Sequence, residues 1–184
     1  MVHVKIVLLG DPSCSKTSVA LSFLDNCFPG EIVPKGIGDR TVRLKLHQNK
    51  SIKLTLWDPG DRPRTATCSG ASVVFLCFTG VSRPSFVSLQ SLWLGYLNHT
   101  YTDIPYFIVA TRIDLLLDPV WNGNFAWASG DMQECKVLAQ ELGVPYFECS
   151  AHTGKGIRVL FEEAIKVGYM HETTKKSRNP CPIG

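Results

Sequence analysis

A loop that could bind phosphate groups lies near the start of the chain, at residues 10–17. It follows an apolar run and opens a segment with helical spacing of apolar residues, and only Ser15 separates it from the pattern GxxxxGK followed by Ser or Thr. In such a loop, backbone N–H groups surround phosphate oxygens, the lysine reaches the β- and γ-phosphates and the next hydroxyl binds Mg²⁺. An ordinary strand-to-helix turn is the alternative for this pattern taken alone. We expect phosphate contacts from Gly10, Ser13, Cys14, Ser15, Lys16, Thr17 and Ser18, with Thr17 also a metal ligand.

Three further short motifs follow predicted strands. After the third strand, Asp58 could hold a metal-bound water and Gly60 could offer its N–H to a terminal phosphate. At residues 111–114, the Asp114 carboxylate can accept two hydrogen bonds from guanine, and at residues 148–151 a backbone N–H could meet the guanine carbonyl. Each string is common by chance. Together, in order and at the carboxyl ends of strands where α/β proteins bind ligands, they predict a guanine-nucleotide site.

The strands and helices that must position these motifs alternate along the chain. Buried strands are predicted from continuous apolar runs at residues 4–9, 73–78, 106–110 and 144–149. Alternation with a period of two predicts a hairpin at residues 41–58, and helical patterns lie at residues 16–24, 86–97, 131–142 and 157–165. Runs buried on both faces indicate a parallel sheet covered by helices. We therefore predict a single α/β domain with a mostly parallel six-stranded sheet, one antiparallel edge strand and helices on both faces.

Composition excludes several other classes. With 184 residues, 45% of them hydrophobic and 19% charged, the chain is neither disordered nor too short for a core. A net charge of +3 gives no reason to expect nucleic-acid binding, and no apolar run is long enough to span a membrane. The seven cysteines form no CxxC pair, and the chain begins directly with a strand rather than a signal peptide. We expect a cytoplasmic monomer with reduced thiols.

In these motifs, the sequence resembles a Ras-superfamily small GTPase of the Rho/Rac branch, from Val4 to around Tyr169. The branch-specific matches are residues 28–31, 56–58, 75–78, 81–86 and 148–151. The resemblance implies a P-loop (Ras-like) domain over residues 1–170 with a Rho-type insert near residues 115–130. It also implies a GTP/GDP-dependent signalling switch, of the kind that regulates the cytoskeleton, that uses Mg²⁺.

The resemblance also implies roles for individual residues. Phe28 would pack against the guanine base, and Thr111, Arg112 and Asp114 would form the guanine-selective motif, supported by Ser150 and Ala151. Thr17 and Asp58 would serve the metal. Protein effectors and regulators would bind the two switch segments, which run from Ile32 to Asp39 and from Pro59 to Gly70.

The sequence departs from the family pattern in the phosphate loop and in both switches. Pro12 and Ser15 replace glycines, and a positive φ at Ser15 would oppose nucleotide binding by about 1–3 kcal/mol. Lys35 stands where the family has a threonine that binds Mg²⁺. A lysine cannot ligate a cation; it could meet phosphate as a point charge, and a solvated loop lysine is the alternative. The second switch is shorter and lacks the glutamine that orients water.

These departures predict slow hydrolysis, with Lys16, Gly60 and Asp61 as the nearest catalytic set. A pseudo-GTPase scaffold without a nucleotide cycle is the rival reading. An adenine-nucleotide enzyme is disfavoured because Asp114 would repel the lone pairs of adenine. His152, directly after the last motif, reads as an incidental loop residue.

The insert and the tail leave alternatives open. Trp121, Phe125 and Trp127 could contact a partner or membrane, or fold back onto the domain. Residues 171–184 lack apolar periodicity and predict a flexible basic tail. Its Cys181 imitates a prenylation site after a basic stretch, which would bring the protein to the inner face of the plasma membrane, although a plain soluble tail fits equally.

Overall fold

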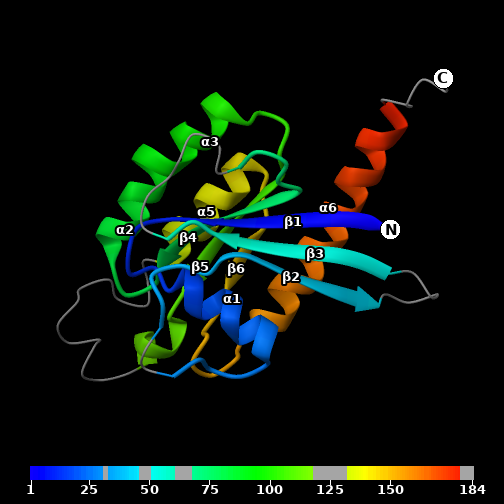
Figure 1. Cartoon of the computed structure of the whole chain (residues 1–184). Coiled ribbons are helices and arrows are strands. Elements are labelled where there is room, and N and C mark those ends of the chain that lie inside the picture. The colour runs from blue at the N-terminus through cyan, green and yellow to red at the C-terminus, as the bar shows by residue number, and fades with distance from the viewer. Residues whose placement is uncertain (31–32, 46–50, 61–67, 118–131, 179–184) are drawn as a thin grey trace, which may run out of the picture.

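A computed structural model describes residues 1–30, 33–45, 51–60, 68–117 and 132–178. Six strands form one sheet in the order β2-β3-β1-β4-β5-β6 (Figure 1). They are β1 (Val2–Leu9), β2 (Gly38–Lys45), β3 (Ser51–Asp58), β4 (Val73–Thr79), β5 (Tyr106–Thr111) and β6 (Tyr146–Glu148). Strands β2 and β3 pair antiparallel, and the other neighbouring pairs are parallel. The predicted sheet with one antiparallel edge strand is confirmed.

Helices connect the strands at every crossover that the described residues contain. They are α1 (Lys16–Asp25), α2 (Arg83–Ser88), η1 (Leu89–Trp93), α3 (Leu94–Thr100), η2 (Ile113–Leu117), α5 (Met132–Leu142) and α6 (Ile157–Arg178). Helices α2, η1 and α3 follow one another without a break, and η1 is a π-helical turn. The predicted helix over residues 86–97 is therefore present, but apolar spacing did not reveal the π-turn within it.

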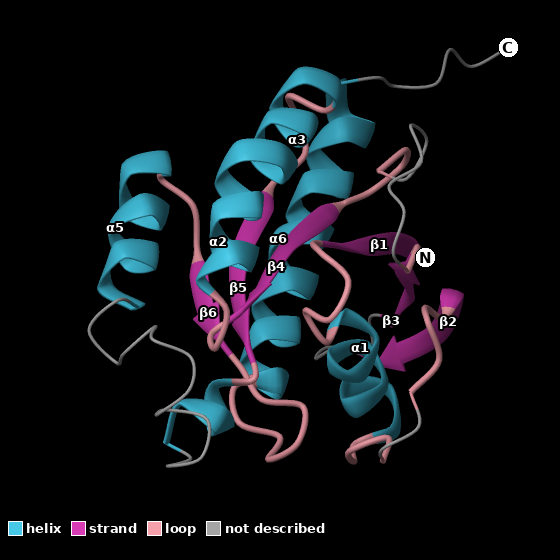
Figure 2. Ribbon diagram, turned by 90° about the vertical axis from the view of Figure 1, so that its left-hand side faces the viewer, coloured by secondary structure: helices cyan, strands magenta, loops and turns pink. Residues whose placement is uncertain are grey.

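The core lies on both faces of the sheet. Val4, Ile6 and Leu8 of β1 are fully buried in one cluster with apolar residues of α1 and α6. Val7 and Leu9 point the other way and pack with residues of α2, α3 and α5. Figure 2 shows these three helices beside strands β4, β5 and β6. Successive side chains of a strand face opposite sides, so a continuous apolar run fits a sheet that helices cover on both faces.

The expectation of a flexible tail from His171 is wrong for residues 171–178. Helix α6 continues to Arg178, and Pro180 follows two residues later. Residues 170–178 include no Gly or Pro that would stop a helix, and the Ser72 hydroxyl donates a 2.8 Å hydrogen bond to the Glu172 carboxylate, which ties this end to the sheet. Cys181 lies outside the described residues. Within the described part of the chain, we find no helix with an apolar stretch long enough to cross a membrane.

Parallel strands bring the predicted motifs to one edge of the sheet. The phosphate loop follows β1, Asp58 ends β3, Thr111 ends β5, and residues 149–151 follow β6. These four strands run in the same direction, so their carboxyl ends share an edge. This edge is where the site must be sought.

Candidate nucleotide-binding site

The phosphate loop has a conformation that its serines adopt at a cost. Gly10 has a φ of 145°, and a Cβ there would overlap the backbone carbonyl of Cys77. Ser13 and Ser15 also have positive φ, at 71° and 52°. A side chain in this region costs about 1–3 kcal/mol and persists only where the surroundings enforce it. The strain predicted for Ser15 is present, and Ser13 adds a second strained position that the sequence did not indicate.

Lys16 lies across the centre of this loop. Its side chain is buried, and its ammonium donates to the backbone carbonyls of Gly10 at 2.9 Å and Asp11 at 2.8 Å. A lysine ammonium carries three N–H donors, so it can add a phosphate oxygen to these two bonds. The lysine is thus held in the position that a phosphate-binding loop requires.

Two predicted site residues support the loop from behind instead of facing the cavity. The Cys14 side chain is buried, and burial raises the pKa of its thiol to about 11, so it offers only its backbone. The Thr111 hydroxyl, also buried, lies 2.9 Å from the Cys14 carbonyl and 3.1 Å from that of Phe78. Thr111 therefore fastens the loop to β5.

Two side-chain oxygens that could bind a metal ion lie next to Lys16. The Thr17 hydroxyl donates a short hydrogen bond to the Asp58 carboxylate, whose other oxygen accepts from the Gly60 N–H at 3.0 Å. The described residues contain no cluster of three or more His, Cys, Asp or Glu that could cage an ion. Mg²⁺ needs no such cage, because phosphates and water supply most of its ligands. Thr17 and Asp58 fit that ion.

The two switch segments touch at Gly60. A Cβ on Gly36 would lie 3.0 Å from the Gly60 nitrogen, and a Cβ on Gly60 would overlap the Lys35 carbonyl. The exposed Lys35 side chain lies in the same cavity wall as Lys16. Of the predicted catalytic set, Lys16 and Gly60 are thus placed at the site, whereas Asp61 lies outside the described residues.

The side of the site that is predicted to hold the guanine base, here called the guanine side, is built from two loops that hydrogen-bond to each other. The Ile113 N–H donates to the Cys149 carbonyl at 3.4 Å, which joins the loop after β5 to the loop after β6. The buried Ser150 hydroxyl accepts the Thr153 N–H at 3.1 Å and so shapes its own loop. Asp114 and Ala151 line the cavity side by side with the phosphate loop.

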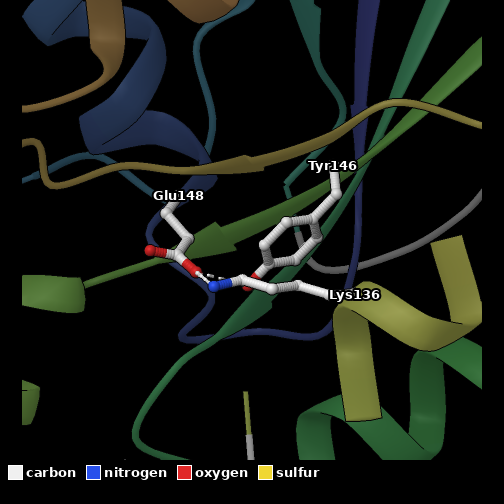
Figure 3. A network of polar contacts seen from close by, with 3 residues as sticks. All are labelled: Lys136, Tyr146 and Glu148. Atoms are coloured by element: carbon white, nitrogen blue, oxygen red, sulfur yellow. Dashed lines mark hydrogen bonds and ion pairs between the residues drawn. The ribbon is translucent and has the colours of Figure 1, made fainter. Parts of the chain in front are cut away.

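A second bond network fixes the strand that leads into this loop. Figure 3 shows the Lys136 ammonium of α5 directed at the Glu148 carboxylate, 3.2 Å away, and the Tyr146 hydroxyl donating to the same oxygen at 3.2 Å. Burial, with Glu148 nearby, raises the pKa of Tyr146, so the phenol stays a donor. Glu148 is held immediately before the guanine-side loop.

The rings of Phe28 and His152 contact each other in the cavity wall. Their ring centroids are 5.0 Å apart with an interplanar angle of 80°, an edge-to-face contact. Both line the cavity, and the packing of Phe28 against a guanine base stays a prediction. His152 is a wall residue that sequence reasoning missed; its position directly after Ser150 and Ala151 was the available signal.

These walls enclose one cavity of about 600 Å³, a volume typical of small-molecule sites. The predicted residues that line it are Ser13, Ser15, Lys16, Thr17, Ser18, Phe28, Gly60, Arg112, Asp114 and Ala151. Gly10, Cys14, Asp58, Thr111 and Ser150 stand behind the wall and bond to its members or shape its loops. Lining residues beyond the predicted set include Pro12, Val33, Pro34, Lys35 and His152.

The fold and this cavity define a Ras-like nucleotide-binding domain, and comparisons with known proteins agree. The model of the Ras family matches residues 5–169. The Rho-related protein racE of Dictyostelium discoideum is 34% identical over 174 residues, covering 90% of this chain and 77% of racE. The GTP-binding protein RHO1 of Saccharomyces cerevisiae is 28% identical, covering 97% of this chain and 94% of its own, and rho1 of Schizosaccharomyces pombe is 28% identical with shares of 93% and 89%. The chain belongs to the Ras family and is a Rho-like small GTPase.

Proposed function

We propose that this chain binds GDP and GTP with Mg²⁺ and works as a signalling switch whose intrinsic hydrolysis is slow. The single observation that carries the proposal is that Lys16, Thr17, Phe28 and Asp114 line one cavity. The lysine ammonium would then bind the phosphates and the threonine hydroxyl the metal. The phenylalanine ring would pack against the base, and the aspartate carboxylate would accept from the edge of the base. Family membership supports the same ligand.

The metal would be held by Thr17 and, through water, by Asp58. When bound, Mg²⁺ supplies charge that neutralises the phosphate oxygens. The Thr17–Asp58 bond shows that both side chains already lie together, and the Gly60 N–H fixes the direction of the carboxylate. Lys16 would bring the second positive charge to the same phosphates.

Slow hydrolysis follows from what the second switch lacks. Phosphoryl transfer depends on a positioned water and on charge stabilisation. The sequence has no glutamine after Gly60, and Asp61 in its place would bring a negative charge toward phosphate.

A scaffold without nucleotide is the second candidate, and one observation favours it. Ser13 and Ser15 hold the phosphate loop at positive φ at an energetic cost, which a chain that never binds phosphate could tolerate. In that case the segments around Lys35 and Gly60 would still serve as a protein-binding surface. Recruitment to membranes through Cys181 would be compatible with either function.

Purified protein separates the two candidates. Nucleotide released by denaturation and run on an ion-exchange column should be GDP or GTP, and calorimetry in Mg²⁺ buffer should detect GDP but not ADP binding. Absence of both signals would leave only the scaffold. A single-turnover GTP assay then tests hydrolysis, and a rate equal to that of a typical Rho protein would contradict the slow-hydrolysis proposal.

Asp114→Asn gives a matched specificity test. The carboxylate would accept from the N1–H and the amino group of guanine, whereas an asparagine amide can donate to the carbonyl that xanthine carries instead. We expect GDP affinity to fall by about a hundredfold and xanthosine diphosphate to bind in its place. Unchanged GDP affinity, with no gain in binding of xanthosine diphosphate, would place Asp114 outside the base site.

A further inference from the structure

We infer that Trp93 is a positioning residue for the phosphate loop, acting through the side chain of Asp11. The inference rests on the proposed nucleotide binding. The indole N–H of Trp93 donates a 2.8 Å hydrogen bond to the Asp11 carboxylate. Trp93 is 4% exposed, so this bond is shielded from water on its side, and a carboxylate acceptor makes it stronger than a neutral one.

Asp11 connects Trp93 to Lys16 through its own backbone. Its carbonyl oxygen accepts from the Lys16 ammonium at 2.8 Å and from the Cys14 N–H at 3.3 Å. The residue is therefore held at both ends, by the indole at its side chain and by the lysine at its carbonyl. A movement of the Asp11 backbone would therefore strain the bonds at its carbonyl and the bond to the indole together.

The loop has particular need of such a brace. Ser13 and Ser15 hold positive φ values where glycine would be unstrained, and Pro12 contributes no N–H donor to the loop. A strained conformation persists only when its surroundings over-determine it. The Thr111 hydroxyl fastens the loop to β5, and Trp93 fastens it to the helical segment on the other side of the sheet.

The π-helical turn η1 places the Trp93 indole next to Asp11. Trp93 is the last residue of η1, and the turn inserts an extra residue between α2 and α3. A regular helix would rotate every side chain after Leu89 by about one residue, roughly 100°. The π-turn and the Trp93 bond therefore belong together, in keeping with the frequent occurrence of π-turns at functional sites.

Trp93 also fixes the position of the negative charge on Asp11. Asp11 belongs to the phosphate loop, and a carboxylate released from the indole would be free to approach the phosphates and repel them. The hydrogen bond from the Trp93 indole holds the Asp11 carboxylate oxygen against the helical segment. Removal of that donor should therefore weaken nucleotide binding, and removal of the charge on Asp11 should repair much of the damage.

The test compares Trp93→Phe, Asp11→Asn and the double variant in the full chain, with release of a fluorescent GDP analogue in Mg²⁺ buffer as the measurement. Phe keeps the ring but has no N–H, and Asn keeps the acceptor but has no charge. We expect Trp93→Phe to release nucleotide about tenfold faster and Asp11→Asn to stay within about threefold of the natural chain. The double variant should release more slowly than Trp93→Phe alone.

Trp57→Phe is the matched control, because Trp57 is a partly buried tryptophan that contacts Lys5 at 4.1 Å and lies outside the loop. Its release rate should not change. An equal acceleration by Trp93→Phe with and without Asp11→Asn would overturn the inference, since it would mean that the ring acts only by packing. If Trp93→Phe does not fold, Asp11→Leu removes the acceptor together with the charge, whereas Asp11→Asn keeps an acceptor. Faster release from Asp11→Leu than from Asp11→Asn would then support the brace, and equal release would overturn it.

Hydrogen exchange separates failure of this inference from failure of the proposed function. In nucleotide-free protein, residues 10–16 should exchange about tenfold faster in Trp93→Phe than in the natural chain, while β4 and α6 stay unchanged. This result would support the positioning role even if GDP does not bind. Unchanged exchange in residues 10–16 would overturn it, whatever the protein binds.

Discussion

The backbone carbonyl of Lys35 occupies the space that a side chain at Gly60 would need. Gly60 has a φ of 73°, and its N–H donates to the Asp58 carboxylate. The two segments expected to respond to nucleotide are therefore in van der Waals contact through main-chain atoms. Movement of one of them requires the other to yield.

Gly60→Ala tests this contact. The methyl group would meet the Lys35 carbonyl and force an alanine into the left-handed region, so we expect a loss of about 3 kcal/mol in the free energy of unfolding. Gly70→Ala is the control, because Gly70 has a φ of 69° but nothing within 4 Å of the added atom. It should lose only about 1 kcal/mol. Urea denaturation measures both, and equal losses would show that the Lys35 contact can relax.

Ser15→Gly should improve the phosphate loop. Ser15 has a φ of 52° and makes no side-chain cap bond, so glycine relieves strain without losing a hydrogen bond. We expect the free energy of unfolding to rise by about 0.5–1 kcal/mol after the greater freedom of glycine in the unfolded chain is counted. Ser18→Gly, within α1, should change stability in the opposite direction by about 0.5 kcal/mol. Destabilisation by both substitutions would argue against strain at Ser15.

The alkylation rate of Cys14 indicates how readily the phosphate loop opens. Burial raises the pKa of Cys14 to about 11 and that of Cys149 to about 12, whereas Cys27 is exposed. A raised pKa leaves less thiolate at a given pH, so at pH 8 Cys14 should be alkylated at least about a hundredfold more slowly than Cys27. Mass spectrometry after timed iodoacetamide treatment checks this. Similar rates in the folded protein would mean that the loop opens readily, and urea should abolish any difference.

Residue chemistry and strand order allowed most of the site to be predicted. Lys16 and Asp114 come shortly after strands with continuous apolar runs, and Asp58 ends a strand with alternating apolar residues, so their convergence followed from the parallel sheet. What these residues bond to did not follow. Thr111 was expected at the ligand, yet its hydroxyl holds the Cys14 carbonyl, because the strand ends behind the loop.

Contacts across long sequence distances could not be predicted. Trp93 and Asp11 are 82 residues apart, and their bond depends on a π-turn that apolar spacing does not reveal. The end of α6 was misjudged for a related reason. Its last turns have no apolar stripe, and a hydrogen bond donated to Glu172 by the hydroxyl of Ser72, 100 residues earlier, ties them to the sheet. Local patterns contain no information on either pair.

Lys35→Thr tests how this chain would recognise a third phosphate. Lys35 lines the cavity near Lys16 and Gly60, and its charge can meet a phosphate oxygen but cannot bind Mg²⁺. In the natural chain, only Thr17 and Asp58 would serve the metal, so we expect the affinity for a non-hydrolysable GTP analogue to depend on Mg²⁺ no more strongly than the affinity for GDP does. A threonine hydroxyl would restore a metal ligand, and the ratio of dissociation constants in EDTA and in Mg²⁺ should rise about tenfold. Calorimetry gives both constants.

Lys53→Thr, which removes an exposed lysine of β3 that does not line the cavity, should leave the ratio unchanged. If Lys35→Thr also leaves it unchanged while the analogue still binds, the Lys35 side chain does not reach the third phosphate.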